Sequence, residues 1–251
     1  MKLYRNSRHS QQSGFTLLEL MISLLILGVV TGAVFSQMNV AQQRMTTEQV
    51  KLDDFQEARD FVDQFFRDIN QIGDPNPRMF DFTGVIWAPP LDPNPINDSR
   101  LAAGLVKIDA NYLQFEGSVN GLGNVQSVIY SINGSGTCAL CLQRSQVDKV
   151  TGNPLTQATN WGTEVNDVAS NPIFLFYDTT GTQITALPVD ISTAAGANII
   201  ASIKTIKLSL TIQNPVVIDQ KTKQPIETNF EGEVSLNNCS MAATGIGMSC
   251  N

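Results

Sequence analysis

Apolar residues run from Phe15 to Phe35 with a single ionisable group among them, Glu19. A run of this length predicts a membrane-spanning helix over residues 15–36, because about 20 apolar residues in a helix cross the core of a bilayer. A charge in such a helix is unfavourable, by about 2.5–3.5 kcal/mol for comparable groups at the membrane centre. Glu19 is near one end of the run, so its cost is smaller, but it still requires a partner.

The helical pattern continues beyond the apolar run, since no proline occurs from Phe15 to Ile72. Toward its end, apolar residues recur every three or four positions and form one broad stripe. The stripe predicts packing on a partner surface, most simply a sheet from the same chain. Gly73 and Asp74-Pro75 are a strong stop signal, so the predicted helix spans 15–73. The stripe contains Leu52, Phe55, Ala58, Val62, Phe65, Phe66, Ile69 and Ile72, with Asp53, Glu57, Asp60, Asp63, Arg67 and Asp68 mostly on the other side.

The rest of the chain reads as a loop followed by strands. Residues 74–104 hold six of the 11 prolines and predict a long connecting loop. Segments of β-branched and aromatic residues between turn signals then predict strands in a β-rich domain over 105–251. These are Leu105–Asp109, Tyr112–Glu116, Val125–Ile132, Leu140–Gln146, Ile173–Tyr177, Ile203–Ile212 and Glu227–Leu236, while residues 194–201 fit either a short helix or a loop. Strands grouped after one long helix favour an α+β fold with the helix packed on an antiparallel β-sheet.

The apolar run begins at a polar-to-apolar junction with one carboxylate just inside it, Ser13-Gly14-Phe15-Thr16-Leu17-Leu18-Glu19-Leu20. The leader before this junction has no acid and carries Lys2, Arg5, Arg8 and His9. A secretory signal peptide has an apolar core of about 7–15 residues and a small-residue cleavage site after it. Here the run is longer, holds Glu19 and continues into a helix. An ordinary single-pass anchor explains the length, but not an acid directly behind Gly-Phe-Thr.

Residues Gly14 to Met21, after a short basic leader, resemble the N-terminus of a type IV pilin-like precursor. Residues 55–69 are similar to the helix continuation of PilW-type minor pilins and J-type pseudopilins. The resemblance implies a pilin fold, and cleavage of the leader 1–14 between Gly14 and Phe15 by a membrane prepilin peptidase. It also implies methylation of the new Phe15 amine and assembly with other pilin subunits on an inner-membrane platform. Glu19 is then expected to pair with the Phe15 amine of a neighbouring subunit, or alternatively with its own.

Length and charge narrow the function further. The chain has 251 residues and a formal charge of −7. The leader holds three of the 16 Lys/Arg and none of the 23 Asp/Glu, which leaves −10 for the remainder. An acidic body without a basic run is poorly suited to bind nucleic acid, so no such partner is predicted. The basic leader is expected to stay cytoplasmic and the body to lie in the periplasm, with residues 15–36 in contact with membrane lipid.

Four cysteines, Cys138, Cys141, Cys239 and Cys250, all fall in the part that is expected to be exported. An oxidising compartment favours disulfides, and four cysteines allow three pairings. The preferred pairing is Cys239–Cys250, which closes a C-terminal loop, with Cys138–Cys141 as the second bridge. A cysteine-only zinc site and a free Cys-x-x-Cys strand remain alternatives.

Other patterns point to packing rather than to catalysis. Gly28 and Gly32 form a Gly-x-x-x-Gly pattern that allows close helix packing in a membrane. The only histidine, His9, lies in the leader, so no histidine base acts in the mature chain. The segment from Asp92 to Asp98 has oxygen ligands suited to calcium but lacks the spacing of an EF-hand. No catalytic residue, cofactor or metal site is predicted.

These observations favour a structural, non-enzymatic minor pilin that is part of a type IV pilus or primes its assembly. A type II secretion pseudopilin is the alternative in the same class, and the N-terminus does not separate the two. A tip adhesin is the alternative from the binding class, with a ligand site in the proline-rich loop or the glycine-rich turns. A membrane-tethered enzyme is disfavoured, because no catalytic constellation is visible.

Overall fold

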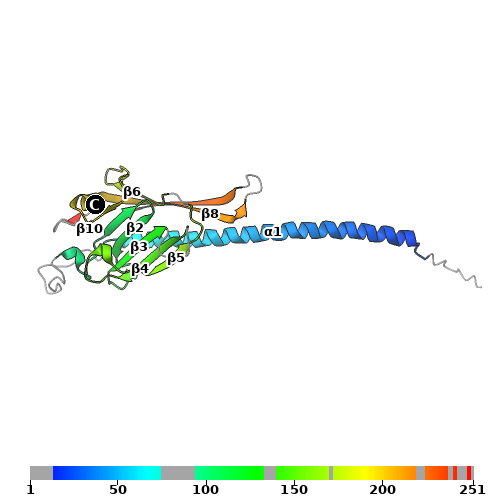
Figure 1. Cartoon of the computed structure of the whole chain (residues 1–251), viewed down its shortest axis with the longest axis horizontal. Coiled ribbons are helices and arrows are strands. Elements are labelled where there is room, and N and C mark those ends of the chain that lie inside the picture. Colours follow the sequence, from blue (N-terminus) through cyan, green and yellow to red (C-terminus); the bar gives the residue numbers. More distant parts are fainter. Residues whose placement is uncertain are drawn as a thin grey trace, which may run out of the picture. The chain divides into compact units, whose positions relative to one another are not determined.

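The computed structural model describes residues 14–74, 94–132, 140–169, 172–218, 224–236, 240–241 and 248–249. The chain forms two compact units, Met1–Val50 and Lys51–Asn251. The helix α1 (Leu17–Asn70), coloured from blue to cyan in Figure 1, contributes residues to both units. Each unit is therefore described by itself.

In the first unit, α1 carries apolar side chains that are exposed among the described residues of that unit. Leu17 is 78% exposed and Val34 is 54% exposed. Within the described residues, α1 is the one helix that is long and apolar enough to cross a membrane, judged by length and composition. A helix that is apolar on all sides is stable only inside a protein core or a membrane, so this half is consistent with membrane anchoring.

In the second unit, the remainder of α1 buries one stripe of side chains. Ala58, Phe65, Ile69 and the following Ile72 are buried, as the sequence predicts. The stripe is displaced from the predicted one at its beginning, since Leu52 is 66% exposed. Phe61, which the sequence analysis left out, is buried instead, while Val62 and Phe66 pack at the margin of the core.

Six strands form the larger sheet, in the order β5-β4-β3-β2-β1-β7. All neighbouring pairs are antiparallel. The strands are β1 (Leu105–Asp109), β2 (Tyr112–Gly117), β3 (Gln126–Ile132), β4 (Leu142–Asp148), β5 (Trp161–Val165) and β7 (Val189–Asp190). We call this the large sheet, and β2 to β5 lie side by side in Figure 1.

Three further strands form the small sheet, in the order β6-β8-β9. They are β6 (Phe174–Asp178), β8 (Ile203–Ile218) and β9 (Pro225–Ser235), again antiparallel. The helix α2 (Ala194–Ser202) precedes β8, and the Thr193 hydroxyl caps it by accepting from the Gly196 backbone N–H. The short elements are β10 (Ser240–Met241), β11 (Met248–Ser249) and the 3-10 turns η2 (Pro95–Asn97) and η3 (Pro154–Thr156).

Phe65 of α1 connects both sheets through the core. Its ring lies 5.5 Å from the ring of Tyr130 on β3 and 5.7 Å from the ring of Phe174 on β6. Phe66 covers β9 where Gly232 lies, and a Cβ at Gly232 would come within 2.1 Å of its ring. The glycine allows close approach of helix and strand, and a larger residue would have to displace the Phe66 ring.

The end of α1 is fixed to the large sheet through the backbone. The Gly73 N–H donates to the Glu116 carbonyl at 2.9 Å, and Ile72 forms an isolated bridge with Gly117. Gly73 has a φ of 75°, a left-handed conformation that favours glycine after the last turn of a helix. The helix thus ends at Asn70, three residues before Gly73, where the chain reaches the margin of the sheet.

The predicted α+β class and the antiparallel pairing are confirmed, with two principal sheets in place of one. Each predicted strand overlaps an observed one, and the segment 194–201 is helical. The sequence analysis missed β5 and β7, which are short strands at the edges of the large sheet. Such strands carry too few apolar residues to form a recognisable alternation.

Candidate functional site

The first turn of α1 is closed by a reciprocal contact between Thr16 and Glu19. A carboxylate oxygen of Glu19, Oε2, accepts from the Thr16 backbone N–H at 3.0 Å and from the Thr16 hydroxyl at 3.2 Å. In return, the Glu19 N–H donates to the Thr16 hydroxyl oxygen at 3.3 Å. This arrangement is a capping box, which satisfies backbone donors that the helix itself leaves unpaired.

The capping box gives Glu19 a partner within its own chain. The sequence analysis looked for that partner in the Phe15 amine and missed Thr16, although the Thr-x-x-Glu spacing is a known sequence signal for a capping box. The carboxylate also lies in the first helical turn, where the helix dipole favours negative charge by typically 0.3–1 kcal/mol. Pairing with a Phe15 amine stays a prediction, since that amine exists only after cleavage.

The predicted cleavage and packing residues are open to their surroundings. Gly14 and Phe15 are both exposed just before the capping box. Gly28 and Gly32 lie within α1, and a Cβ at either would meet no atom within 4 Å. Their glycine character is thus not required by contacts within the first unit, and their role in packing against another helix stays a prediction.

A buried polar cluster joins α1 to the large sheet in the second unit. The Asp68 carboxylate oxygen Oδ2 accepts from the Tyr130 hydroxyl at 2.7 Å and from Arg144 Nε and Nη2 at 2.9 and 2.7 Å. All three residues are buried, although Asp68 was expected mostly among the solvated helix residues. Burial raises the pKa of Tyr130 well above its ordinary value, and the neighbouring Asp68 charge acts in the same direction. The hydroxyl therefore stays protonated and donates to Asp68.

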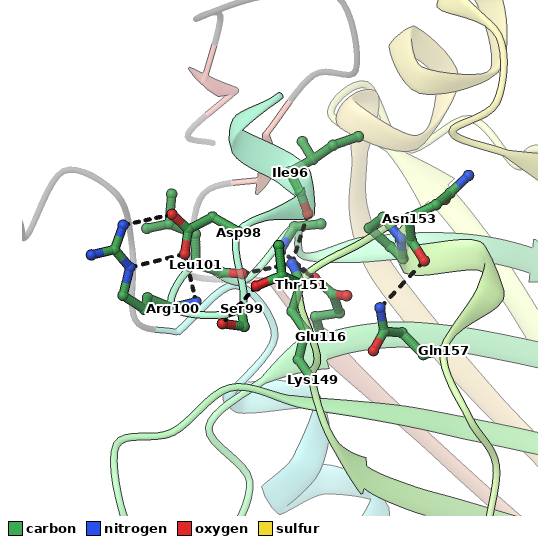
Figure 2. Close-up of polar contacts among 12 residues, drawn as sticks. Ile96, Asp98, Ser99, Arg100, Leu101, Glu116, Lys149, Thr151, Asn153 and Gln157 are labelled. Carbon is green, nitrogen blue, oxygen red and sulfur yellow. Dashed lines mark hydrogen bonds and ion pairs between the residues drawn. The ribbon is translucent and has the colours of Figure 1, made fainter. Parts of the chain in front are cut away.

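A second buried cluster surrounds Lys149, shown in Figure 2. Its ammonium nitrogen lies 2.6 Å from Glu116 Oε2 and donates to the carbonyls of Ile96 and Leu101 at 2.7 and 2.8 Å. The Ala103 N–H also donates to Glu116 Oε2, at 2.9 Å. The ion pair thus fixes residues 96–103 against β2, because it bonds to the backbone of that segment at three places.

Burial acts on the charge of both partners in this cluster. It raises the pKa of the Glu116 carboxyl, against the attraction of Lys149, and it lowers the pKa of Lys149, against the attraction of Glu116. Glu116 Oε1 is buried and has no hydrogen-bond partner among the residues that the structure describes. The arrangement holds the fold together at this end of the sheet, and it presents no exposed reactive group.

Asp98 lies next to this cluster and is held by Arg100. The two carboxylate oxygens of Asp98 accept from Arg100 Nε at 3.0 Å and from Nη2 at 2.7 Å, as Figure 2 shows. Asp92, the other end of the calcium-like segment, lies outside the described residues. Among the residues that the structure describes, there is no group of three or more His, Cys, Asp or Glu that could hold a metal ion.

The cysteine predictions fall mostly outside the described residues. Cys138, Cys239 and Cys250 lie there, as does the whole Cys239–Cys250 pairing. Cys141, directly before β4, is buried and disulfide-bonded. Which cysteine it pairs with stays a prediction, with Cys138 as the expected partner.

Comparison with known proteins bears on the N-terminal segment. Residues 9–35 match the family model of the prokaryotic N-terminal methylation motif. The matched segment contains Gly14, Phe15, Thr16 and Glu19. No curated protein and no solved structure matches the chain. The match supports a type IV pilin-like or pseudopilin precursor. In general terms, it implies processing by a prepilin peptidase and assembly with other pilins.

Proposed function

We propose that this chain is a structural, non-enzymatic minor pilin that is incorporated into a type IV pilus or primes its assembly. One observation carries the proposal. A capping box holds Glu19 at the start of an exposed apolar helix, directly after Gly14-Phe15, within a segment that matches the methylation motif. The body would then be the specialised part of the subunit.

Cleavage after Gly14 has two physical consequences. It removes the three basic residues of the leader, which otherwise favour retention on the cytoplasmic side. It also creates a cationic amine on Phe15, with an ordinary pKa of about 7.7–8.0. Glu19 lies four residues further on, or about 6 Å along the helix axis. Its free lone pairs can accept from the Phe15 amine of a neighbouring subunit while Thr16 keeps the carboxylate oriented.

The proposed organisation follows from these steps. Residues 1–14 form the leader, 15–36 cross the inner membrane, 74–104 connect helix and sheets, and 105–251 form the periplasmic body. The prepilin peptidase, other pilin subunits and the inner-membrane assembly platform are the proposed partners. The Asp68 and Lys149 clusters suit a subunit that transmits force, because they bond α1 and the connecting segment to the large sheet.

Processing is tested by the mass of the native protein extracted from membranes. We expect a chain that starts at Phe15 and carries one added methyl group. Gly14→Lys should leave the leader attached, because the peptidase must accept a residue without a side chain at the cut. Gln11→Lys places the same side chain three residues earlier and should be processed normally. An unprocessed wild-type protein would contradict the proposal.

Assembly is tested with Glu19→Ala in cells that lack the native gene. We expect normal cleavage but loss of the subunit from sheared filaments. Asp53→Asn removes an exposed charge from the same helix beyond the membrane segment and should assemble normally. Undiminished incorporation of Glu19→Ala would refute the assembly role. Deleting the gene while counting filaments and assaying protein secretion distinguishes a minor pilin from a type II secretion pseudopilin.

A further inference from the structure

A polar groove lies at the β5 edge of the large sheet, within the second unit. Its volume is about 450 Å³. It forms because β5 pairs with β4 only from Leu142 to Ser145, so the end of β4 continues beyond its neighbour. This volume is within the range of about 300–1,000 Å³ that is typical of small-molecule sites.

Three side chains of the lining, Gln126, Gln146 and Asp148, are connected by hydrogen bonds. Asp148 Oδ1 accepts from Asn124 Nδ2 at 2.7 Å and from Gln126 Nε2 at 3.0 Å. Gln126 Oε1 in turn accepts from Gln146 Nε2. Gln126 is buried, so this chain of amides has a fixed orientation. Gln146 Oε1 and Asp148 Oδ2 take part in no hydrogen bond with the described residues and remain available as acceptors.

Other residues of the lining supply donors as well as an acceptor. Arg144 uses Nε and Nη2 to bind Asp68, and Nη1 makes no hydrogen bond with the described part of the chain. The same holds for the side-chain amide of Asn160 and the indole N–H of Trp161, which both line the groove. Glu164, also in the lining, is half-buried and has no ion-pair partner among the described residues.

This lining matches groups that donate and accept at the same time. A sugar hydroxyl does both, whereas an amine only donates and a carboxylate only accepts. The indole of Trp161 adds an apolar face with a polar N–H, on which the C–H face of a sugar ring can stack. From this combination we infer that the β4–β5 groove is a binding site for a neutral saccharide unit.

The net charge of the groove lining disfavours the binding of acidic sugars. The guanidinium of Arg144 is neutralised by Asp68, from which it lies 2.7 Å away. Asp148 and Glu164 then give the lining a negative balance, which repels an anionic ligand. The site is distinct from the proposed assembly residues, and it goes beyond the structural role of the subunit.

The test uses the full-length chain in detergent on an array of neutral and sialylated oligosaccharides. We expect binding to at least one neutral glycan and weaker binding to its sialylated counterpart. A Trp87→Phe background leaves Trp161 as the only tryptophan, because the chain has two. Titrating the neutral glycan found on the array should then change the fluorescence of Trp161.

Variants locate the site. Trp161→Ala and Gln146→Ala should each weaken binding at least tenfold, whereas Thr163→Ala should not. Thr163 is exposed on β5 but does not line the groove, so it is a matched control. Unchanged thermal unfolding would show that each variant is folded. Binding of no neutral glycan, a preference for sialylated glycans, or full binding by both groove variants would overturn the inference without affecting the proposed pilin role.

Discussion

Replacing Asp68 by alanine removes the one carboxylate that connects α1 to Tyr130 and Arg144. Its Oδ2 accepts three hydrogen bonds of 2.7 to 2.9 Å. The Arg144 side chain is only 9% exposed, and its Nε and Nη2 would both lose their carboxylate acceptor. Removing one member of a buried ion pair typically costs about 3–5 kcal/mol, because the remaining charge is left uncompensated. We expect the free energy of unfolding to fall by about this amount.

The size of the effect separates this contact from an ordinary surface charge. Asp63 lies on the same part of α1 and is exposed, so Asp63→Ala should change the free energy of unfolding by less than about 0.5 kcal/mol. The triple variant Asp68→Leu/Arg144→Met/Tyr130→Phe removes both charges and the buried hydroxyl that binds them, and fills the space with apolar groups. It should recover most of the stability, since apolar replacement of a buried pair is often neutral or stabilising.

The measurement is denaturant unfolding of the full chain in detergent, in the Trp87→Phe background, followed by the fluorescence of Trp161 on β5. A single transition with an unchanged dependence on denaturant concentration would show that only stability has changed. Two results would refute the reasoning. One is a loss of less than about 1 kcal/mol in Asp68→Ala, which is the range of an exposed pair. The other is a triple variant as unstable as Asp68→Ala alone.

Three further predictions concern other parts of the chain. Thr16→Val removes the hydroxyl of the capping box while keeping the shape of the side chain, and should reduce filament incorporation; Thr16→Ser, which keeps the hydroxyl, should not. Burial raises the pKa of Glu164 above its ordinary value of 4.5, so stability is lost as pH rises through the raised pKa. The glutamine in Glu164→Gln does not titrate. In unfolding experiments, the free energy of unfolding of this variant, relative to that of the wild type, should therefore increase from acidic to neutral pH. Gly28→Ala/Gly32→Ala should raise helix propensity by up to about 1 kcal/mol per site. The double variant should nevertheless impair assembly in a filament count, because the added methyl groups prevent close helix packing. Full assembly would exclude that packing role.

The features of the N-terminal segment could be predicted from the sequence, because each depends on residues that are close together along the chain. These features are an uninterrupted apolar run, one acid and a Gly-Phe junction, and each can be recognised from a few consecutive residues. The capping box was equally readable, since Thr16 and Glu19 have a spacing that is known to form it. Only the charge of a new N-terminus had been considered as a partner for Glu19. The strands with alternating or β-branched residues were likewise predictable, as β8 shows.

Other features could not be read from the sequence, because their partners are far apart along the chain. Asp68 was expected mostly on the solvated side of the helix, and only the position of Tyr130 and Arg144 on β3 and β4 makes it a buried acceptor. Lys149 and Glu116 are 33 residues apart, and nothing in their local sequences indicates that they meet. The short edge strand β5 becomes recognisable only through its pairing with β4.

The order of polar and apolar segments can be predicted from local patterns: a basic N-terminal segment, an apolar helix with one acid near its start, a helical continuation with one apolar stripe, and a β-rich body. The helix and the strands follow from the period of hydrophobic residues, which each element imposes on its own sequence. The burial of particular polar residues and the position of the groove depend instead on the tertiary structure. Those properties depend on which strands become neighbours, and pairing across dozens of residues leaves no local trace.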